Sequence, residues 1–299
     1  MTNKLILNEV TKEFGEKQVI KPLSFSLEPN TTTALIGPNG SGKTTIMSMI
    51  AGLLTPTSGS INFNNQSNFR EHIGFLPQYP SFFPYMSALE YIEMSAQLSN
   101  VPKQIIRKRS LEILEYVGLE NDIHHKIDTF SGGMKQRLGI AQAIIHQPKL
   151  LLLDEPVSAL DPIGRQEVMN LIKDLEKSMT ILYSTHILND AEHMTKRLIF
   201  LKEGSIVEQG SLEEIQKKYA APKIIIQFEN ELEANHFATT NGYTALEKIV
   251  SIDLHTTTTT MKQILTILAQ SSYQITKVEK STASLEEIFM KVAGDDAAI

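Results

Sequence analysis

The fold of this chain is decided by residues 37–44, which read Gly37-Pro38-Asn39-Gly40-Ser41-Gly42-Lys43-Thr44. They match the pattern G-x-x-x-x-G-K-[ST]. A short, apolar, partly β-branched run at 33–36 precedes them and predicts a buried strand, and residues 46–54 predict a helix. Glycines in such a place let successive backbone N–H groups converge on a phosphate, and the helix N-terminus adds positive dipole. The stretch therefore predicts a phosphate-binding loop.

Two side chains of this loop carry chemistry. Lys43 is expected to neutralise the β- and γ-phosphates of a nucleotide, and the Thr44 hydroxyl to bind Mg²⁺. The competing interpretation is a glycine-rich turn with a surface lysine. Because kinases, GTPases and motor ATPases share such loops, the loop predicts nucleotide binding and leaves the function open.

A pair of carboxylates follows the next apolar run. Residues 150–153 are four leucines, which predict a second buried strand, and Asp154 and Glu155 come directly after them. Open α/β sheets bind their ligands at the carboxyl ends of strands. We expect Asp154 to hold Mg²⁺ and Glu155 to polarise the water that attacks the γ-phosphate. Two solvated carboxylates at a strand end are the alternative.

The rest of the first 220 residues alternates between strands and helices. Residues 1–30 predict strands, and 180–184 predict a third buried strand. Asp161 and Pro162 open a helix through residue 177, with Asp as the N-cap. Helices are expected mainly within 79–147, at 86–98, 104–117 and 133–146. This alternation predicts an α/β fold with a mainly parallel sheet.

A composition shift marks a second region. Ala220-Ala221-Pro222 has the character of a linker. Beyond it, strands are expected at 224–228, 249–254 and 273–278, and helices at 261–269 and 285–292. We predict one domain over 1–220, with a helical subdomain at about 79–147, and a small α+β accessory domain over 221–299.

Four further motifs narrow the class. Phe130-Ser131-Gly132-Gly133-Met134 precedes a helix, so Ser131 is placed as an N-cap and the glycines expose N–H groups. Taken alone, this is a capped turn. The remaining motifs are Gln78 after a strand-like run, Ser158-Ala159-Leu160-Asp161 after the acidic pair, and Ser184-Thr185-His186 after the third buried strand.

In this order and spacing, over residues 1–215, the motifs resemble the ABC ATPase family. The resemblance implies a P-loop NTPase core with an antiparallel β subdomain and a helical subdomain, ATP and Mg²⁺ as cofactors, and ATP hydrolysis. It implies catalytic roles for Lys43, Gln78, Glu155 and His186, and Mg²⁺ contacts from Thr44, Gln78 and Asp154. ATP contacts are implied for Phe14, Gly37, Pro38, Asn39, Gly40, Ser41, Gly42, Lys43, Thr44, Thr45, Ser131, Gly132 and Gly133. Communication between paired subunits is implied for Ser158, Ala159, Leu160 and Asp161.

Three positions need comment. Phe130 stands where the family usually has Leu, and Met134 where it usually has Gln, so a small change is expected near the ribose. Phe14 occupies the place of the aromatic residue that stacks on adenine in this family. A core position in a strand is the alternative for Phe14.

Composition limits the partners. The chain has a net charge of −6 and no cysteine, which argues against a broad nucleic-acid surface and excludes disulfides and thiolate metal sites. No apolar run approaches the ~20 residues that span a bilayer, so we expect membrane contact only through a partner.

The family resemblance then implies a working unit. The chain is expected to be the ATP-hydrolysing subunit of a transporter, paired as a homodimer or with a related subunit, on the cytoplasmic face of the cell membrane beneath an integral membrane permease. Residues 284–292 resemble the tails of bacterial drug, bacteriocin and sodium exporter subunits, which favours export; an amphipathic closing helix also explains them. The alternative function is a soluble ABC ATPase of the translation or DNA-repair type. Those proteins normally carry two cassettes or a long inserted coiled coil, and neither is evident here.

Overall fold

The computed structural model describes residues 4–64, 69–219, 222–254, 257, 259–281 and 284–293. The chain divides into two compact units, Met1–Leu212 and Glu213–Ile299. The expected linker residues Ala220 and Ala221 lie outside the described residues. Each unit has its own sheet and its own apolar core.

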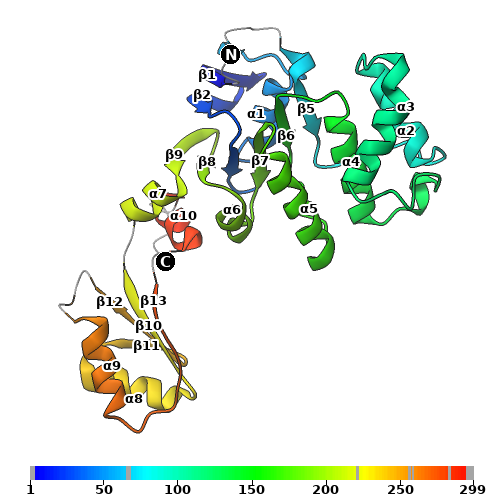
Figure 1. The fold of residues 1–299 in the computed structure, drawn as a ribbon. Coiled ribbons are helices and arrows are strands. Elements are labelled where there is room, and N and C mark those ends of the chain that lie inside the picture. Colours follow the sequence, from blue (N-terminus) through cyan, green and yellow to red (C-terminus); the bar gives the residue numbers. More distant parts are fainter. Residues whose placement is uncertain are drawn as a thin grey trace. The chain divides into compact units, whose positions relative to one another are not determined.

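A six-stranded sheet forms the centre of the first unit, in the order β5-β6-β7-β3-β8-β9 (Figure 1). The first five strands of that order are parallel, and β9 is antiparallel to β8. The expectation of an α/β fold with a mainly parallel sheet is confirmed. The strands are β3 (Thr32–Ile36), β5 (Ile73–Leu76), β6 (Leu150–Leu153), β7 (Thr180–Thr185), β8 (Arg197–Lys202) and β9 (Ser205–Ser211).

A three-stranded antiparallel sheet, β2-β1-β4, completes the β part of this unit. Its strands are β1 (Leu5–Phe14), β2 (Lys17–Leu27) and β4 (Ser58–Phe63). One apolar core joins this sheet, the helix α1 (Lys43–Ile50) and the parallel sheet. Because α1 buries Ile46, Met47 and Ile50 in that core, the N-terminus of α1 is held rigidly at the carboxyl end of β3.

The remaining helices of this unit include a group with a core of its own, formed by α2, α3 and α4 (Figure 1). The helices are α2 (Ala88–Leu98), α3 (Ile106–Tyr116), α4 (Gly132–Ile144), α5 (Pro162–Leu175) and α6 (Leu188–Met194), with short 3₁₀ turns at Arg70–His72, Lys103–Ile105 and Ile127–Thr129. α4 packs so closely on β5 that a Cβ at Gly74 would lie 2.1 Å from the Ala143 carbonyl oxygen. This contact ties the helical group to the sheet. Within the described ranges of the whole chain, no helix combines the length and apolar character that crossing a bilayer requires.

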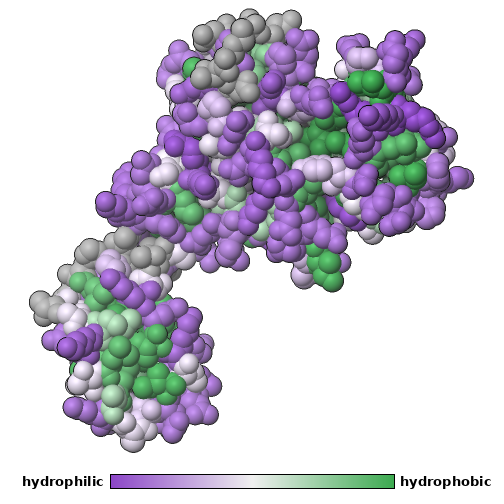
Figure 2. Space-filling model, viewed as in Figure 1, coloured by the Kyte–Doolittle hydropathy of each residue, from purple (hydrophilic) through white to green (hydrophobic). Residues whose placement is uncertain are grey.

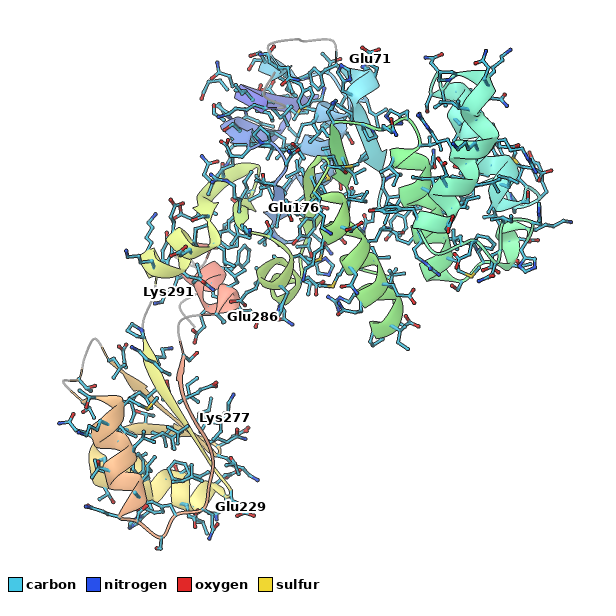
Figure 3. The ribbon with its side chains drawn as sticks, viewed as in Figure 1. Glu71, Glu176, Glu229, Lys277, Glu286 and Lys291 are labelled. Atoms are coloured by element: carbon cyan, nitrogen blue, oxygen red, sulfur yellow. The ribbon has the colours of Figure 1, made fainter. Side chains whose placement is uncertain are left out.

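Helix α5 is anchored at both ends. Asp161 is its N-cap, as predicted, and accepts a hydrogen bond from the Gly164 N–H at 2.8 Å. Glu176, labelled in Figure 3, follows the last turn and accepts a hydrogen bond from the Thr32 hydroxyl at 3.1 Å. Because Thr32 begins β3, the second anchor joins α5 to the strand that leads into the phosphate loop.

The second unit is a four-stranded antiparallel sheet, β11-β12-β10-β13, with helices on one face. Its elements are α7 (Leu212–Tyr219), β10 (Lys223–Phe228), α8 (Glu231–Asn241), β11 (Thr244–Leu246), β12 (Ile249–Asp253), α9 (Met261–Ala269), β13 (Ile275–Ser281) and α10 (Leu285–Ala293). The core is built from alternate residues of the strands and from α8 and α9. Large apolar side chains also reach its surface, including Leu232 and Leu246, and Figure 2 shows hydrophobic residues gathered on the visible face.

The loop after α4 contains a partly buried histidine, His146, with a consequence for acid stability. His146 donates from Nε2 to the Ile73 carbonyl at 3.0 Å, and its Nδ1 has no partner in the described part of the chain. Burial lowers the pKa of His146, the hydrogen bond to Ile73 opposes this, and His72 lowers it further. Between the folded and the ordinary pKa of this residue, His146 therefore binds fewer protons in the folded chain than in the unfolded chain.

We expect the contribution of His146 to the free energy of unfolding to fall as the pH drops below about 6.5, the ordinary histidine pKa, and to level off below the folded pKa of His146. His146→Gln keeps an N–H donor and removes the titration, so it should lose less stability between pH 7.5 and 5.5 than the parent chain. Urea unfolding at both pH values measures this. His124→Gln, at an exposed histidine, is the control. Equal losses in the parent and in His146→Gln would contradict the prediction.

Candidate functional site

The phosphate loop leaves a fully buried strand and enters a helix. β3 is buried throughout, and the loop passes into α1 at Lys43. Gly40 and Gly42 have φ values of 80° and 108°, which side chains rarely permit, so glycine is required at both. The loop borders a cavity of about 370 Å³. The cavity is lined by Val19, Asn39, Gly40, Gly42, Lys43, Thr44, Thr45, Gln78 and Glu155.

Lys43 is held inside this loop rather than at the surface, because its side chain is only 5% exposed. Its ammonium donates hydrogen bonds to the carbonyl oxygens of Gly37 at 2.8 Å and Pro38 at 3.2 Å. It also lies 3.6 Å from Glu155 Oε1. Burial lowers the pKa of Lys43, and the carboxylates of Glu155 and Asp154 oppose that shift. The turn with a surface lysine, the alternative drawn from the sequence, is therefore wrong.

Glu155 stands at the centre of the predicted catalytic residues. Its Oε2 accepts a hydrogen bond from Gln78 Nε2 at 3.1 Å, and His186 Nδ1 lies 3.2 Å from the same oxygen. With Lys43 at Oε1, one buried carboxylate contacts all three of the other residues expected to be catalytic. They meet because Gln78, Glu155 and His186 each follow one of the adjacent strands β5, β6 and β7.

Asp154 immediately precedes Glu155 in the chain, and its side chain is buried, at 1% exposed. Its Oδ1 accepts a hydrogen bond from the Ser184 hydroxyl at 2.5 Å, and its Oδ2 is buried without a partner among the described residues. A buried carboxylate oxygen without a partner is costly unless another group completes it. Asp154, Thr44 and Gln78 carry oxygen atoms, the donor type that Mg²⁺ prefers, and Thr44 and Gln78 line the first cavity. Within the described residues, no group of three or more His, Cys, Asp and Glu side chains could hold a metal ion. The donor set therefore fits a hard cation bound by few protein ligands.

A second cavity, of about 280 Å³, holds the signature-like motif. Ser131 is the N-cap of α4, as predicted, and accepts a hydrogen bond from the Met134 N–H at 3.2 Å. The cavity is lined by Ser131, Gly132, Gly133, Met134, Arg137, Ala159, Leu160, Asp161, Ile163, Gly164 and Glu167. It thus brings together two motifs, residues 131–133 and 159–161, that lie apart in the sequence. It shares no lining residue with the first cavity.

Two glycines of this second cavity, Gly132 and Gly133, have no tight packing contact that would explain them. A Cβ at Gly132 would have its nearest neighbour, Leu160 Cδ2, at 3.9 Å, and one at Gly133 would meet the Gly164 Cα at 3.8 Å. These are ordinary contacts, and neither glycine has a positive φ. Among the described residues, neither packing nor backbone geometry therefore demands a glycine at position 132 or 133.

The remaining predicted residues lie apart from the first cavity or at its edge. Ser158 donates a hydrogen bond to the Glu155 carbonyl oxygen at 3.2 Å. Phe14 is 48% exposed at the end of β1, with the Lys12 ammonium 4.9 Å from its ring centroid, so the core-strand alternative is wrong. Phe14 does not line the cavity, and stacking on adenine stays a prediction. Phe130 is buried in the core of the helical group.

Two residues of the site were not predicted to have a role. Val19 lines the first cavity but gives no chemical signal in a strand pattern. Ser184 was noted only as the start of Ser184-Thr185-His186, yet it contacts both members of the acidic pair. A hydroxyl residue at the carboxyl end of a buried strand, next to the acidic strand end, is the signal that could have found it.

The site combines a glycine-rich loop that leads into a helix, a buried lysine, and a buried carboxylate in contact with that lysine. These features define a P-loop nucleotide-hydrolysing site. The family model for ABC transporters matches residues 20–158, and the model for the C-terminal domain of DrrA1-3-like ATP-binding proteins matches residues 210–293. The chain belongs to the ATP-binding proteins of ABC transporters, and it is an ATPase of that family.

Relatives match over nearly the full length. The chain is 38% identical to the ABC transporter ATP-binding protein YxlF of Bacillus subtilis strain 168, over 96% of this chain and 99% of that protein. It is 31% identical to the bacitracin transport ATP-binding protein BcrA of Bacillus licheniformis, over 96% of each chain. Among solved structures, a dimeric ATP-binding cassette in a post-hydrolysis state, bound to ADP and Pi, superposes with a TM-score of 0.63 at 31% identity. That match covers 70% of this chain and 98% of the other, and it confirms the fold expected from the motifs.

Proposed function

We propose that this chain hydrolyses ATP as a pair of subunits and drives export through a separate integral membrane permease. The observation that carries the pairing is the second cavity with its glycines. Gly132 is exposed, and none of the described residues requires Gly132 or Gly133 to lack a side chain. Glycine at a helix N-terminus leaves the N–H groups open to close approach by an anion. A nucleotide phosphate held by another subunit meets that description.

Within one subunit, the first cavity takes the phosphates and the catalytic residues. Lys43 and the N–H groups of residues 37–44 bind the β- and γ-phosphates, and Phe14 contributes to adenine. Thr44, Gln78 and Asp154 would hold Mg²⁺, which, when bound, offsets the charge that develops on the phosphates. Glu155 polarises the attacking water, and His186 and Gln78 hold its carboxylate in place.

The two cavities of one subunit share no lining residue, which supports use by different nucleotides. A head-to-tail pair places the loop of one subunit opposite the signature of the other, and residues 158–161 at the junction of the two sites. ATP then joins the subunits, and hydrolysis removes the charge that both grip, so the pair opens. Both a homodimer and a pair with a related subunit satisfy this arrangement.

The transport role rests on the family and on the surface beside Gln78. Tyr79, directly after Gln78, is 79% exposed, and Tyr85, further along the same segment, is 69% exposed, so aromatic side chains are available to a partner there. A permease contact at this segment would transmit movement of Gln78 to the permease. It would also hold the chain at the cytoplasmic face of the membrane. Export is favoured because relatives are named for bacitracin transport and linearmycin resistance. A nucleic-acid partner has no support in a chain with a net charge of −6.

The test uses the full chain carrying Glu155→Gln, which should bind ATP without rapid turnover. With ATP and Mg²⁺ it is expected to run as a dimer in size-exclusion chromatography with light scattering. From detergent-solubilised native membranes it should co-purify with a polytopic membrane protein in a fixed ratio. Adding Gly132→Asp should abolish the dimer while ATP affinity of the monomer stays within about twofold, because an acidic side chain repels the phosphates of the partner's nucleotide.

The matched control is Asn235→Asp, which adds the same charge at an exposed position on helix α8 of the second unit. A dimer that survives Gly132→Asp would contradict the shared site. Co-purification with ribosomal proteins or DNA-repair factors, in place of a membrane protein, would favour the soluble ABC ATPase alternative.

A further inference from the structure

Ser184 lies one residue beyond the last residue pair of β6 and β7, next to the acidic residues Asp154 and Glu155 that follow β6. β6 and β7 pair in parallel up to Leu153 and Tyr183, and the next residues along the two strands are Asp154 and Ser184. Beyond that pair, the Glu155 N–H donates to the Ser184 hydroxyl oxygen at 2.8 Å instead of to a strand carbonyl. Ser184 is fully buried, so no water competes for this hydroxyl.

The same hydroxyl uses its only proton on the other acid. It donates to Asp154 Oδ1 at 2.5 Å while it accepts from Glu155. This bond fixes the rotation of the Asp154 carboxylate and leaves Oδ2, the oxygen without a partner in the described chain, free for a ligand. One side chain therefore determines which oxygen of Asp154 is available.

The bond to Glu155 acts on the backbone. Glu155 has φ 48°, a left-handed conformation that is uncommon for a residue with a side chain. That conformation directs the carboxylate toward Lys43, Gln78 and His186, and the Ser184 hydroxyl holds the amide that begins it. Without the hydroxyl, the buried N–H would lose its acceptor.

We propose that Ser184 is a positioning residue of the hydrolytic site, which orients Asp154 toward the metal and Glu155 toward the attacking water. The inference rests on the proposed roles of Asp154 and Glu155. The competing explanation is a hydroxyl that only satisfies hydrogen bonds in the sheet. That explanation predicts a loss of stability alone, whereas the positioning role predicts a change in the dependence on Mg²⁺.

The test compares Ser184→Ala with the parent chain and with Ser110→Ala. Ser110 is an equally buried serine on α3, and its hydroxyl has no partner among the described residues. Three quantities are measured: ATP affinity without Mg²⁺, the gain in affinity when Mg²⁺ is added, and kcat and KM at saturating Mg²⁺. Affinity without Mg²⁺ is expected to be unchanged in Ser184→Ala. The gain from Mg²⁺ and kcat should each fall by about 10- to 100-fold, the usual effect of losing a group that orients a metal ligand.

Ser184→Cys provides a second variant of similar size, whose S–H is a weak donor, and it should lie between serine and alanine. A Mg²⁺ dependence like that of Ser110→Ala would overturn the inference. So would failure of both Ser184 variants to fold, which would assign the hydroxyl to the stability of the sheet. Asp154→Asn separates the inference from its premise: if this variant hydrolyses ATP normally, the proposed role of Asp154 in holding Mg²⁺ fails, and the inference about Ser184 fails with it. If it is inactive while Ser184→Ala is normal, only the role of Ser184 fails.

Discussion

Lys43→Ala is expected to weaken ATP binding by about 10- to 100-fold, because a charge-assisted hydrogen bond to phosphate is worth about 1.5–3 kcal/mol. The Lys43 side chain is buried in the loop and lines the first cavity. Its hydrogen bonds to the carbonyls of Gly37 and Pro38 hold the ammonium beside the place expected for the phosphates. Isothermal titration calorimetry with ATP and Mg²⁺ measures the change. The loss should also appear with ADP, because the β-phosphate is shared.

The control for Lys43 is Lys108→Ala, which removes one lysine from the surface of α3, where its side chain is 80% exposed. The free energy of unfolding of each variant is measured alongside. Burial lowers the pKa of Lys43, so its removal relieves a desolvated charge, and it also leaves Glu155 without a cation. Unchanged ATP affinity in a folded Lys43→Ala chain would contradict the role of Lys43 as a phosphate clamp.

Glu155→Gln is expected to lower ATP turnover by about 10²- to 10⁴-fold, the range that loss of a general base produces. ATP binding should be retained, because glutamine keeps the shape of the side chain and an oxygen that can accept from Gln78. It also removes the negative charge 3.6 Å from the Lys43 ammonium, which leaves that cation free for phosphate. Phosphate release at saturating ATP and Mg²⁺, together with an equilibrium titration, separates turnover from binding.

Glu71→Gln is the matched control for Glu155, since it makes the same change at a side chain that is 82% exposed and is labelled in Figure 3. Its turnover should equal that of the parent chain. Turnover of the parent rate in Glu155→Gln would contradict the assignment, and equal losses of ATP affinity and turnover would point to a damaged fold instead.

Much of the fold could be predicted because local pattern and caps agree with it. The strand at Leu150–Leu153 and the helix at Met261–Ala269 match the prediction at both ends. Some elements that were not predicted lack such a pattern, although the buried apolar run of β8 at residues 198–201 is a signal that was missed. β9 alternates weakly and is half exposed, and α6 has seven residues and no side chain that caps it. α8 buries only Ala234, Phe237 and Ala238, although its cap residues Asn230 and Gly242 were readable signals.

The sequence by itself determined the chemistry of the site. Each motif is formed by residues that are neighbours in the sequence, so local spacing is enough to identify it. The motifs are the glycine loop between strand and helix, the two acids after four leucines, and the serine-glycine cap of α4. Only the tertiary structure decided how those parts meet. The strand order β5-β6-β7-β3 brings Gln78, Glu155, His186 and Lys43 into contact. The same order places the Ser184 hydroxyl within hydrogen-bonding distance of Asp154 and of the Glu155 N–H. That order is set by crossover connections and by burial of the sheet between helices, and no short stretch of sequence records which strand ends will become neighbours.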